Sequence, residues 1–307
     1  MRESFKVSAP GKLMLLGEHA VLKGKKALVC AVNQRMSIIC KKTSDRKINI
    51  FSSLGDFTTE LDNIRIIPEF SFVLTTIARQ KNKLATGFDL KIESDFAPDI
   101  GLGSSAAVTA ATMTAVFVLS GQEINKPTIF DGCLRTIKKV QGSGSGADLA
   151  ASIFGGILVY QMDPLSIEPL KPVFPISAVY SGSKTPTTTV IKIVEEKYKK
   201  NESLYSRIYD LMDQSVPYAK QYIESNDLKA LGDIFNINQG LMDAIGVSNL
   251  TLSGINYELR RDPGIFGSKI SGSGLGDCVV GIGKPEQPDF PYPVLPLEIS
   301  SKGIIVE

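Results

Sequence analysis

The sequence contains one histidine, His19, and no tryptophan in its 307 residues. A single histidine excludes zinc sites that need two histidines, such as HExxH, and leaves one candidate base for a Ser-His pair. The four cysteines, Cys30, Cys40, Cys133 and Cys278, are far apart and form no CxxC pair. We therefore expect reduced, buried thiols, and a chemistry that depends mainly on lysine, aspartate, serine and backbone groups.

Long hydrophobic runs are also missing. The longest weakly polar run, residues 106–120, is shorter than the roughly 20 residues that a membrane-spanning helix needs. The N-terminal MRESFKVSAP lacks the apolar core of a secretory signal. Lysine and arginine (34) nearly balance aspartate and glutamate (32), and no basic block is present. We expect a cytoplasmic protein that binds neither membrane nor nucleic acid, and a homodimer is compatible with the sequence.

The order of the expected elements predicts an α+β protein with two domains. Apolar patterning predicts strands and helices in the first half. The strands are Phe5–Ser8, Ala27–Val32, Met36–Lys41, Ile48–Phe51 and Phe88–Glu93, and the helices are Pro68–Gln80, Ser104–Leu119 and Pro127–Val140. In the second half, the expected helices Pro186–Lys199, Glu202–Ser225, Asp227–Ala244 and Asn249–Arg260 precede the strands Ile265–Ile270 and Cys278–Ile282. Four prolines between positions 164 and 175 indicate an edge strand or a linker, so we expect domains at 1–165 and 166–307.

The stretch GLGSSAA, residues 101–107, admits several interpretations. It fits the dinucleotide pattern GxGxxA, and Glu123 lies about 20 residues on, where that pattern places an acid. A dinucleotide fold needs a strand between the helix and the acid, whereas GQEINKPTIFDG predicts a turn into another helix. A Walker A loop is absent from the sequence. What remains is either an ordinary loop and helix cap or a phosphate cradle at a helix N-terminus.

Three other segments carry candidate residues. Asp148 begins a short apolar helix after QGSGSG, where an acid commonly serves as a partner of the helix dipole. The segment SGSGLGDC, residues 271–278, is by itself a hairpin with a wide turn. Lys12 stands between Pro10-Gly11 and an apolar run, where it either snorkels to the surface or supplies a fixed positive charge to an anionic site.

The segments APGKLMLLGEHAVL, GLGSSAA, GSGSGADLAAS and SGSGLGDC, in this order, resemble the GHMP kinases, the superfamily of galactokinase and of homoserine, mevalonate and phosphomevalonate kinases. The resemblance covers the chain from Ala9 to about Ile282. It implies an N-terminal domain like ribosomal protein S5 and a ferredoxin-like C-terminal domain, with ATP and Mg²⁺ bound between them. It also implies that the glycine loop cradles the phosphates through Gly101, Leu102, Gly103, Ser104, Ser105, Ala106 and Ala107, with Ser105 as a magnesium ligand.

The resemblance also implies roles for the other segments. Asp148 would be the catalytic base, and Lys12 would stabilise the reacting phosphoryl group or lower the pKa of the attacking hydroxyl. The third glycine motif would close over the substrate with Gly272, Ser273 and Gly274. The segment GEHAVLKG looks most like mevalonate kinases, in which the residues matching Glu18 and His19 line the substrate pocket. SKTPTTT is similar to their KxPxxT pattern, so Thr189 is expected to hold the substrate carboxylate, although a simple helix cap explains it equally well.

The sequence departs from the mevalonate kinase pattern around the base. Gln141, Gly144 and Leu149 stand where that pattern has histidine, proline and asparagine, and Ile137 stands where it has a second magnesium ligand, a glutamate. GSGAD and GDC look more like phosphomevalonate kinases. We expect ATP-dependent phosphorylation of the 5-hydroxyl of mevalonate. The alternatives are a phosphomevalonate kinase and a ligand sensor of the same fold that catalyses no reaction.

Overall fold

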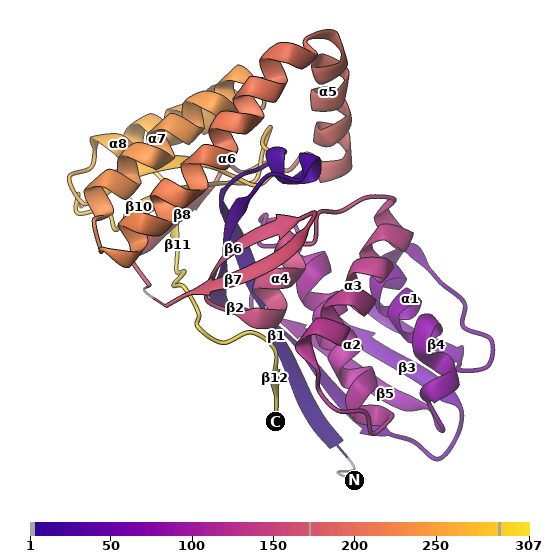
Figure 1. Ribbon diagram of the computed structural model, residues 1–307. Coiled ribbons are helices and arrows are strands. Elements are labelled where there is room, and N and C mark those ends of the chain that lie inside the picture. Colours follow the sequence, from indigo (N-terminus) through magenta and orange to yellow (C-terminus); the bar gives the residue numbers. More distant parts are fainter. Residues whose placement is uncertain (1–3, 172, 288–289) are drawn as a thin grey trace.

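The computed structural model describes residues 4–171, 173–287 and 290–307, and in this part of the chain two sheets are present (Figure 1). The larger sheet has eight strands in the order β12-β1-β2-β5-β3-β4, and β6 and β7 extend it from β2. Its strands are β1 (Ser4–Leu16), β2 (Ala27–Lys42), β3 (Lys47–Ser52), β4 (Gly55–Glu60), β5 (Phe88–Ser94), β6 (Ile157–Met162), β7 (Leu165–Leu170) and β12 (Ile305–Val306). Among the described residues of this sheet, only β3 and β5 pair in parallel.

In the described part of the chain four helices accompany this sheet, and α2 contributes the largest number of buried residues. The helices are α1 (Ser71–Gln80), α2 (Ser104–Leu119), α3 (Lys126–Gln141) and α4 (Ala147–Phe154), with short 3₁₀ turns η1 (Ala20–Lys23), η2 (Pro68–Phe70) and η3 (Lys81–Lys83). The α2 helix contacts α1, α3, α4, β1 and β2. Its alanines and threonines allow this close packing on all sides, and its threonines return their hydroxyls to carbonyls four residues earlier. The expected helix Ser104–Leu119 is confirmed with the same bounds.

The second sheet is antiparallel, with strand order β11-β8-β10-β9. Its strands are β8 (Ile176–Tyr180), β9 (Ile265–Ser271), β10 (Cys278–Gly283) and β11 (Val294–Leu295), and its helices are α5 (Thr187–Lys200), α6 (Glu202–Glu224), α7 (Leu228–Ala244) and α8 (Leu250–Arg261). Helices α7 and α8 pack on β9, and α6 packs on α7 and on η1 of the first half (Figure 1). The N-terminal segment around η1 is thereby held against the second half of the chain.

Several strands differ from the expectations. Strand β1 runs through Pro10 and Gly11 to Leu16, with a register shift against β2, and β2 joins two expected strands into one. Strands β4, β6, β8, β11 and β12 were not expected. The β4 strand has mostly polar residues, β8 closely follows the proline-rich segment, and β11 and β12 have only two residues each. The chain crosses between the sheets after β7, and β12 returns to pair with β1.

Division into domains 1–165 and 166–307 stays a prediction. Among the described residues, no helix has the length and apolar character needed to cross a membrane.

Candidate active site

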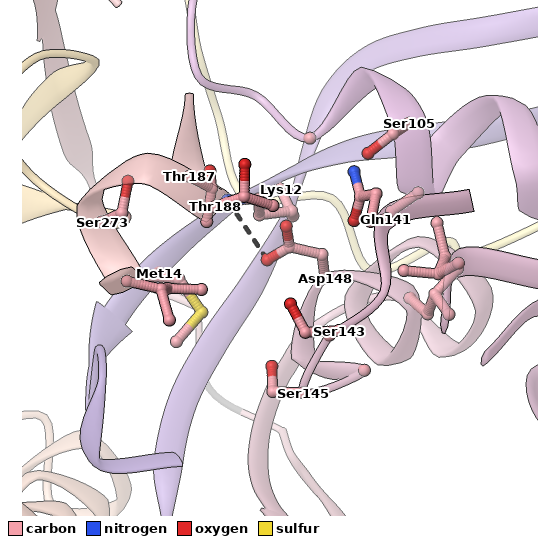
Figure 2. A pocket seen from close by; sticks show the side chains of 18 of the residues that line it. Lys12, Met14, Ser105, Gln141, Ser143, Ser145, Asp148, Thr187, Thr188 and Ser273 are labelled. Carbon is pink, nitrogen blue, oxygen red and sulfur yellow. Dashed lines mark ion pairs between the residues drawn. The ribbon is translucent and has the colours of Figure 1, made fainter. Parts of the chain in front are cut away.

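Lys12 is positioned by the irregularity in β1. The pairing of β1 with β2 shifts between Pro10 and Lys12, and the Lys12 backbone N–H donates to the Leu102 carbonyl at 2.9 Å. Its side chain, only 6% exposed, runs under the glycine loop to the Asp148 carboxylate, where Nζ and Oδ1 are 3.2 Å apart (Figure 2). Residues 136 positions apart in sequence thus form one ion pair at the floor of a cleft.

The cleft is a cavity of about 640 Å³ lined by segments from both halves of the chain. Around the Lys12–Asp148 pair, Thr187, Thr188 and Ser273 lie on one side and Ser105 and Gln141 lie on the other (Figure 2). Of the candidate residues, the cleft brings together Lys12, Glu18, His19, Gly101, Gly103, Ser104, Ser105, Ala106, Asp148, Gly272 and Ser273. Among the described residues, the lining does not include Leu102, Ala107, Thr189 or Gly274.

The glycine loop has the geometry of an anion cradle. Gly103 is the N-cap of α2 with a φ of 74°, and no described side chain caps the helix there. The N–H groups of Ser104 and Ser105 and the helix dipole are therefore available to a negatively charged ligand, whereas the Ala106 N–H donates to the Gly103 carbonyl. The Ser104 hydroxyl donates to the Pro98 carbonyl at 3.1 Å, whereas no hydrogen bond from a described residue engages the Ser105 hydroxyl. These groups fit a nucleotide phosphate, and Ser105 offers one oxygen ligand to its magnesium ion.

Gly103 also leaves room for Lys12, which makes the loop testable. A Cβ at position 103 would lie 2.8 Å from Lys12 Cε, and the lysine is buried with little room to move. We expect Gly103→Ala to weaken ATP binding at least about tenfold, measured by calorimetry with a non-hydrolysable analogue. Gly121→Ala is the matched control, because Gly121 has a similar φ of 68° and no atom within 4 Å of its added Cβ. Equal nucleotide affinity in the two variants would contradict the proposed contact.

Glu18 and His19 tie the N-terminal segment to the second sheet. Glu18 forms a buried ion pair with Lys269 of β9, whose side chain is fully buried and also donates to the Ile270 carbonyl. His19 Nε2 lies 2.9 Å from the Ser273 carbonyl oxygen. Because a carbonyl only accepts, Nε2 carries the proton. Burial lowers the pKa of His19, against the opposing effects of the Ser273 bond and Glu18, so the imidazole is neutral at pH 7.

Lys269, which pairs with Glu18 of the cleft, and Asp277, which lines the cleft, were missed in the sequence. Lys269 resembles an ordinary lysine in a strand, and its position in KIS before a glycine turn was the only signal. Asp277 lies in the GDC of the third glycine motif, where an aspartate is unremarkable in a turn. Asp277 lines the cleft and is 6% exposed. Burial raises the pKa of Asp277, and the charges of Lys12 and Lys184 partly offset this.

Carboxylates for a metal ion are few in the cleft. Ile137 lines it at the position where the resemblance places a glutamate. No cluster of three or more His, Cys, Asp or Glu residues suited to a metal ion is found in the described ranges. Nucleotide-bound magnesium typically keeps several waters and takes one or two protein ligands together with phosphate oxygens. The site therefore fits a magnesium ion that enters with a nucleotide better than one that is held by the protein alone.

Comparisons with known proteins agree with this geometry. Residues 71–156 match the family described as GHMP kinases N terminal domain, and residues 219–290 match GHMP kinases C terminal. Residues 2–42 match a galactokinase galactose-binding signature. The first of these matches includes the glycine loop and Asp148, and the second includes the third glycine motif.

Individual relatives cover almost the whole chain. The mevalonate kinase of Pyrococcus furiosus is 32% identical, and the alignment covers 98% of this chain and 97% of the relative. The crystal structure of the Methanococcus jannaschii mevalonate kinase matches with a TM-score of 0.81 at 22% identity, covering 96% of this chain and 98% of that one. A Streptococcus pneumoniae phosphomevalonate kinase in complex with phosphomevalonate and AMPPNP matches with a TM-score of 0.82 at 19% identity, covering 96% and 99%. The chain has the expected α+β, two-domain kinase fold and belongs to the GHMP kinases, a family of small-molecule kinases.

Proposed function

We propose that the protein is a mevalonate kinase, which transfers the terminal phosphoryl group of ATP to the 5-hydroxyl of mevalonate. The observation that carries this proposal is the Lys12–Asp148 pair, which lies beside the glycine loop in a cleft that also contains Glu18 and His19. The relatives named mevalonate kinase, at about 30% identity over nearly the full chain, support the choice of substrate.

ATP binding is proposed to use two adjoining cavities. The phosphates would lie at the N-terminus of α2, in the cradle formed by residues 101–107. A second cavity of about 510 Å³ shares Ser104 and Ser105 with the cleft, and this volume is in the range of small-molecule sites. Its lining is largely apolar, with side chains that include Met36, Phe70, Ile92, Phe96 and Val108. We place the adenine base there, a choice for which the sequence offered no signal.

The proposed reaction needs a base and fixed positive charge. The Asp148 carboxylate accepts the proton of the substrate hydroxyl as its oxygen attacks the phosphoryl group. Burial opposes the charged form of Lys12, but Asp148, Asp277 and Glu18 outweigh it and raise the pKa of Lys12, so the lysine stays protonated. Its charge holds Asp148 in place and stabilises the charge on the reacting phosphoryl group. Ser105 would be a ligand of a magnesium ion bound with ATP, and that ion would supply further neutralisation of the phosphates.

The substrate carboxylate is proposed to bind at the N-terminus of α5. No described side chain caps this helix, so the N–H groups of Thr187 and Thr188 and the positive dipole end are available to an anion, whereas the Thr189 N–H donates to the Pro186 carbonyl. The segment that contains Thr189 presents Thr187 and Thr188 to the cleft, and Thr189 itself is exposed. The geometry therefore favours Thr188 over Thr189 as the hydroxyl donor.

Replacement of these threonines separates the two candidates. We expect Thr188→Val to raise KM for mevalonate roughly 10- to 100-fold with little change in kcat, because a hydrogen bond to a charged group contributes about 1.5–3 kcal/mol. Thr189→Val, the matched control one residue away, should leave KM near its wild-type value. The reverse pattern in steady-state kinetics would return the assignment to Thr189.

Coupled measurement of ADP release tests the proposed function. Mevalonate, phosphomevalonate and galactose would be supplied separately with Mg-ATP, the last because of the galactokinase signature at residues 2–42. We expect turnover with mevalonate. Turnover with phosphomevalonate alone would establish a phosphomevalonate kinase, the alternative that the GDC of the third glycine motif favours. ATP binding without transfer to any of the three acceptors would support a sensor instead.

We also propose a cytoplasmic location. All four cysteines are buried and unpaired in the structure, as suits a reducing compartment. Burial raises the pKa of the Cys30 and Cys278 thiols to about 12, so they stay protonated and unreactive. The thiols therefore have a packing role and take no part in the proposed phosphoryl transfer.

A further inference from the structure

The backbone holds Asp277 firmly at the edge of the cleft. It lies between β9 and β10 with a φ of 63°, in the left-handed region. Its N–H donates to the Ser183 carbonyl and its carbonyl accepts from the Ser181 N–H, both at 2.9 Å. These two bonds set the direction of the Asp277 side chain. The side chain lines the cleft, although the residue is only 6% exposed.

The Asp277 carboxylate packs against the start of the glycine loop. A Cβ added to Gly101 would lie 3.1 Å from Asp277 Oδ1, and one added to Gly272 would lie 3.5 Å from Oδ2. The carboxylate thus stands between the cradle from the first half of the chain and the third glycine motif from the second. Lys12, Lys184 and Asp148 are the charged groups that act on it.

Asp277 has no partner for its charge among the described residues. Its Oδ1 is buried without a hydrogen bond, and no ion pair includes it. The two nearby lysines are engaged elsewhere, since Lys12 pairs with Asp148 and Lys184 donates to the Pro98 carbonyl at 2.9 Å. A buried, unpaired carboxylate is costly, and phosphates in the adjoining cradle would repel it further. A cation between the carboxylate and the phosphates removes both penalties.

We propose that Asp277 is a ligand of the magnesium ion that enters with ATP, and that it supplies the carboxylate missing at Ile137. Carboxylate and phosphate oxygens, together with the Ser105 hydroxyl, are ligands that magnesium prefers. The ion would then connect the glycine loop of the first half to the third glycine motif of the second. This inference rests on the proposed function only in taking ATP as the nucleotide.

Asp277→Asn is the variant that tests the proposal. Asparagine has nearly the same shape and tolerates the left-handed backbone, so it removes the charge with little strain. Calorimetry would measure the affinity for a non-hydrolysable ATP analogue with Mg²⁺ and with excess EDTA. We expect the affinity gained from Mg²⁺ to fall at least about tenfold, a loss of about 1.4 kcal/mol. Metal-free binding should be unchanged or tighter, because a negative charge beside the phosphates is removed.

Bound Mn²⁺ provides a second readout that is independent of catalysis. Electron paramagnetic resonance would count the Mn²⁺ held by each protein in the presence of the analogue, and we expect weaker retention by Asp277→Asn. Asp277→Gly, for which a positive φ brings no strain, repeats both measurements if the asparagine variant is poorly folded in a thermal melt. If a folded Asp277 variant gains as much nucleotide affinity from Mg²⁺ as the wild type does, the role of Asp277 is overturned.

Asp99→Asn is the matched control. Asp99 is exposed, lies two residues before Gly101 and does not line the cleft, so its replacement removes the same charge near the loop without removing a ligand. Asp99→Asn should keep the full gain in nucleotide affinity from Mg²⁺. An equal loss in both variants would mean that Asp277 acts only through its negative charge and is not a magnesium ligand. If the wild type itself does not bind the nucleotide, the proposed function fails. If only the variant comparison fails, the role of Asp277 alone is overturned.

Discussion

Asp148→Asn is expected to lower kcat with mevalonate at least about 100-fold, within the roughly 10²- to 10⁴-fold contribution of a positioned general base. The amide keeps the shape of the side chain but does not take the proton of the substrate hydroxyl. It also leaves Lys12, 3.2 Å away and almost fully buried, without its closest carboxylate. Steady-state kinetics with a coupled ADP assay would measure the loss, and KM for mevalonate should change far less than kcat.

Asp131→Asn is a suitable control for this measurement. Asp131 is exposed on α3, pairs with Arg135 one turn later and lies outside the cleft. An exposed pair of this kind contributes about 0–1 kcal/mol to stability, so the variant should fold and turn over like the wild type. Near-wild-type kcat in Asp148→Asn would remove Asp148 from the mechanism and would leave Lys12 to act on the phosphoryl group alone.

Lys269→Met is expected to lower the free energy of unfolding by about 3–5 kcal/mol, the usual effect of removing one partner from a buried ion pair. The side chains of Lys269 and Glu18 are 0% and 2% exposed, and Glu18 Oε2 already has no hydrogen bond to a described residue. Methionine fills most of the lysine volume, so the loss comes from a buried carboxylate left without a cation. Urea denaturation followed by circular dichroism would measure it.

Two further variants identify the cause of this loss. Lys25→Met makes the same change in a partly exposed pair with Asp210, 2.5 Å away, and should cost no more than about 1 kcal/mol. Adding Glu18→Gln to Lys269→Met removes the unpaired charge and should restore much of the stability. If the double variant is as unstable as the single one, packing rather than charge explains the role of Lys269.

Local signals in the sequence explain the helices that were predicted well. The expected helix Ser104–Leu119 has the observed bounds, because Gly103 and Gly121 flank an alanine-rich run that no glycine or proline interrupts. The helices of the second half differ from expectation by one residue at most at each end. Strands were predicted less completely. Strand β12 has only two residues, and its pairing with β1 depends on the path of the whole chain.

The candidate site was predicted as separate motifs, and the structure brings most of them to one cleft. Lys12, Asp148 and the glycine loop meet there as the resemblance implied. The choice between Thr188 and Thr189 depended on the rotation of the first turn of α5, which a three-residue run of threonine does not reveal. The glutamate that the family pattern places at position 137 is replaced by Ile137 in this sequence.

The sequence by itself determined the family and predicted a phosphate cradle, because a glycine loop followed by a helix N-terminus is a local backbone geometry. Only the tertiary structure decided which charges share the cleft. Glu18 and Lys269 are 251 positions apart, and Asp277 meets Gly101 across 176 positions. Such pairs leave no periodic or local pattern in the chain. Their energies depend on burial and on the absence of other partners, and both exist only after the two halves of the protein have packed together.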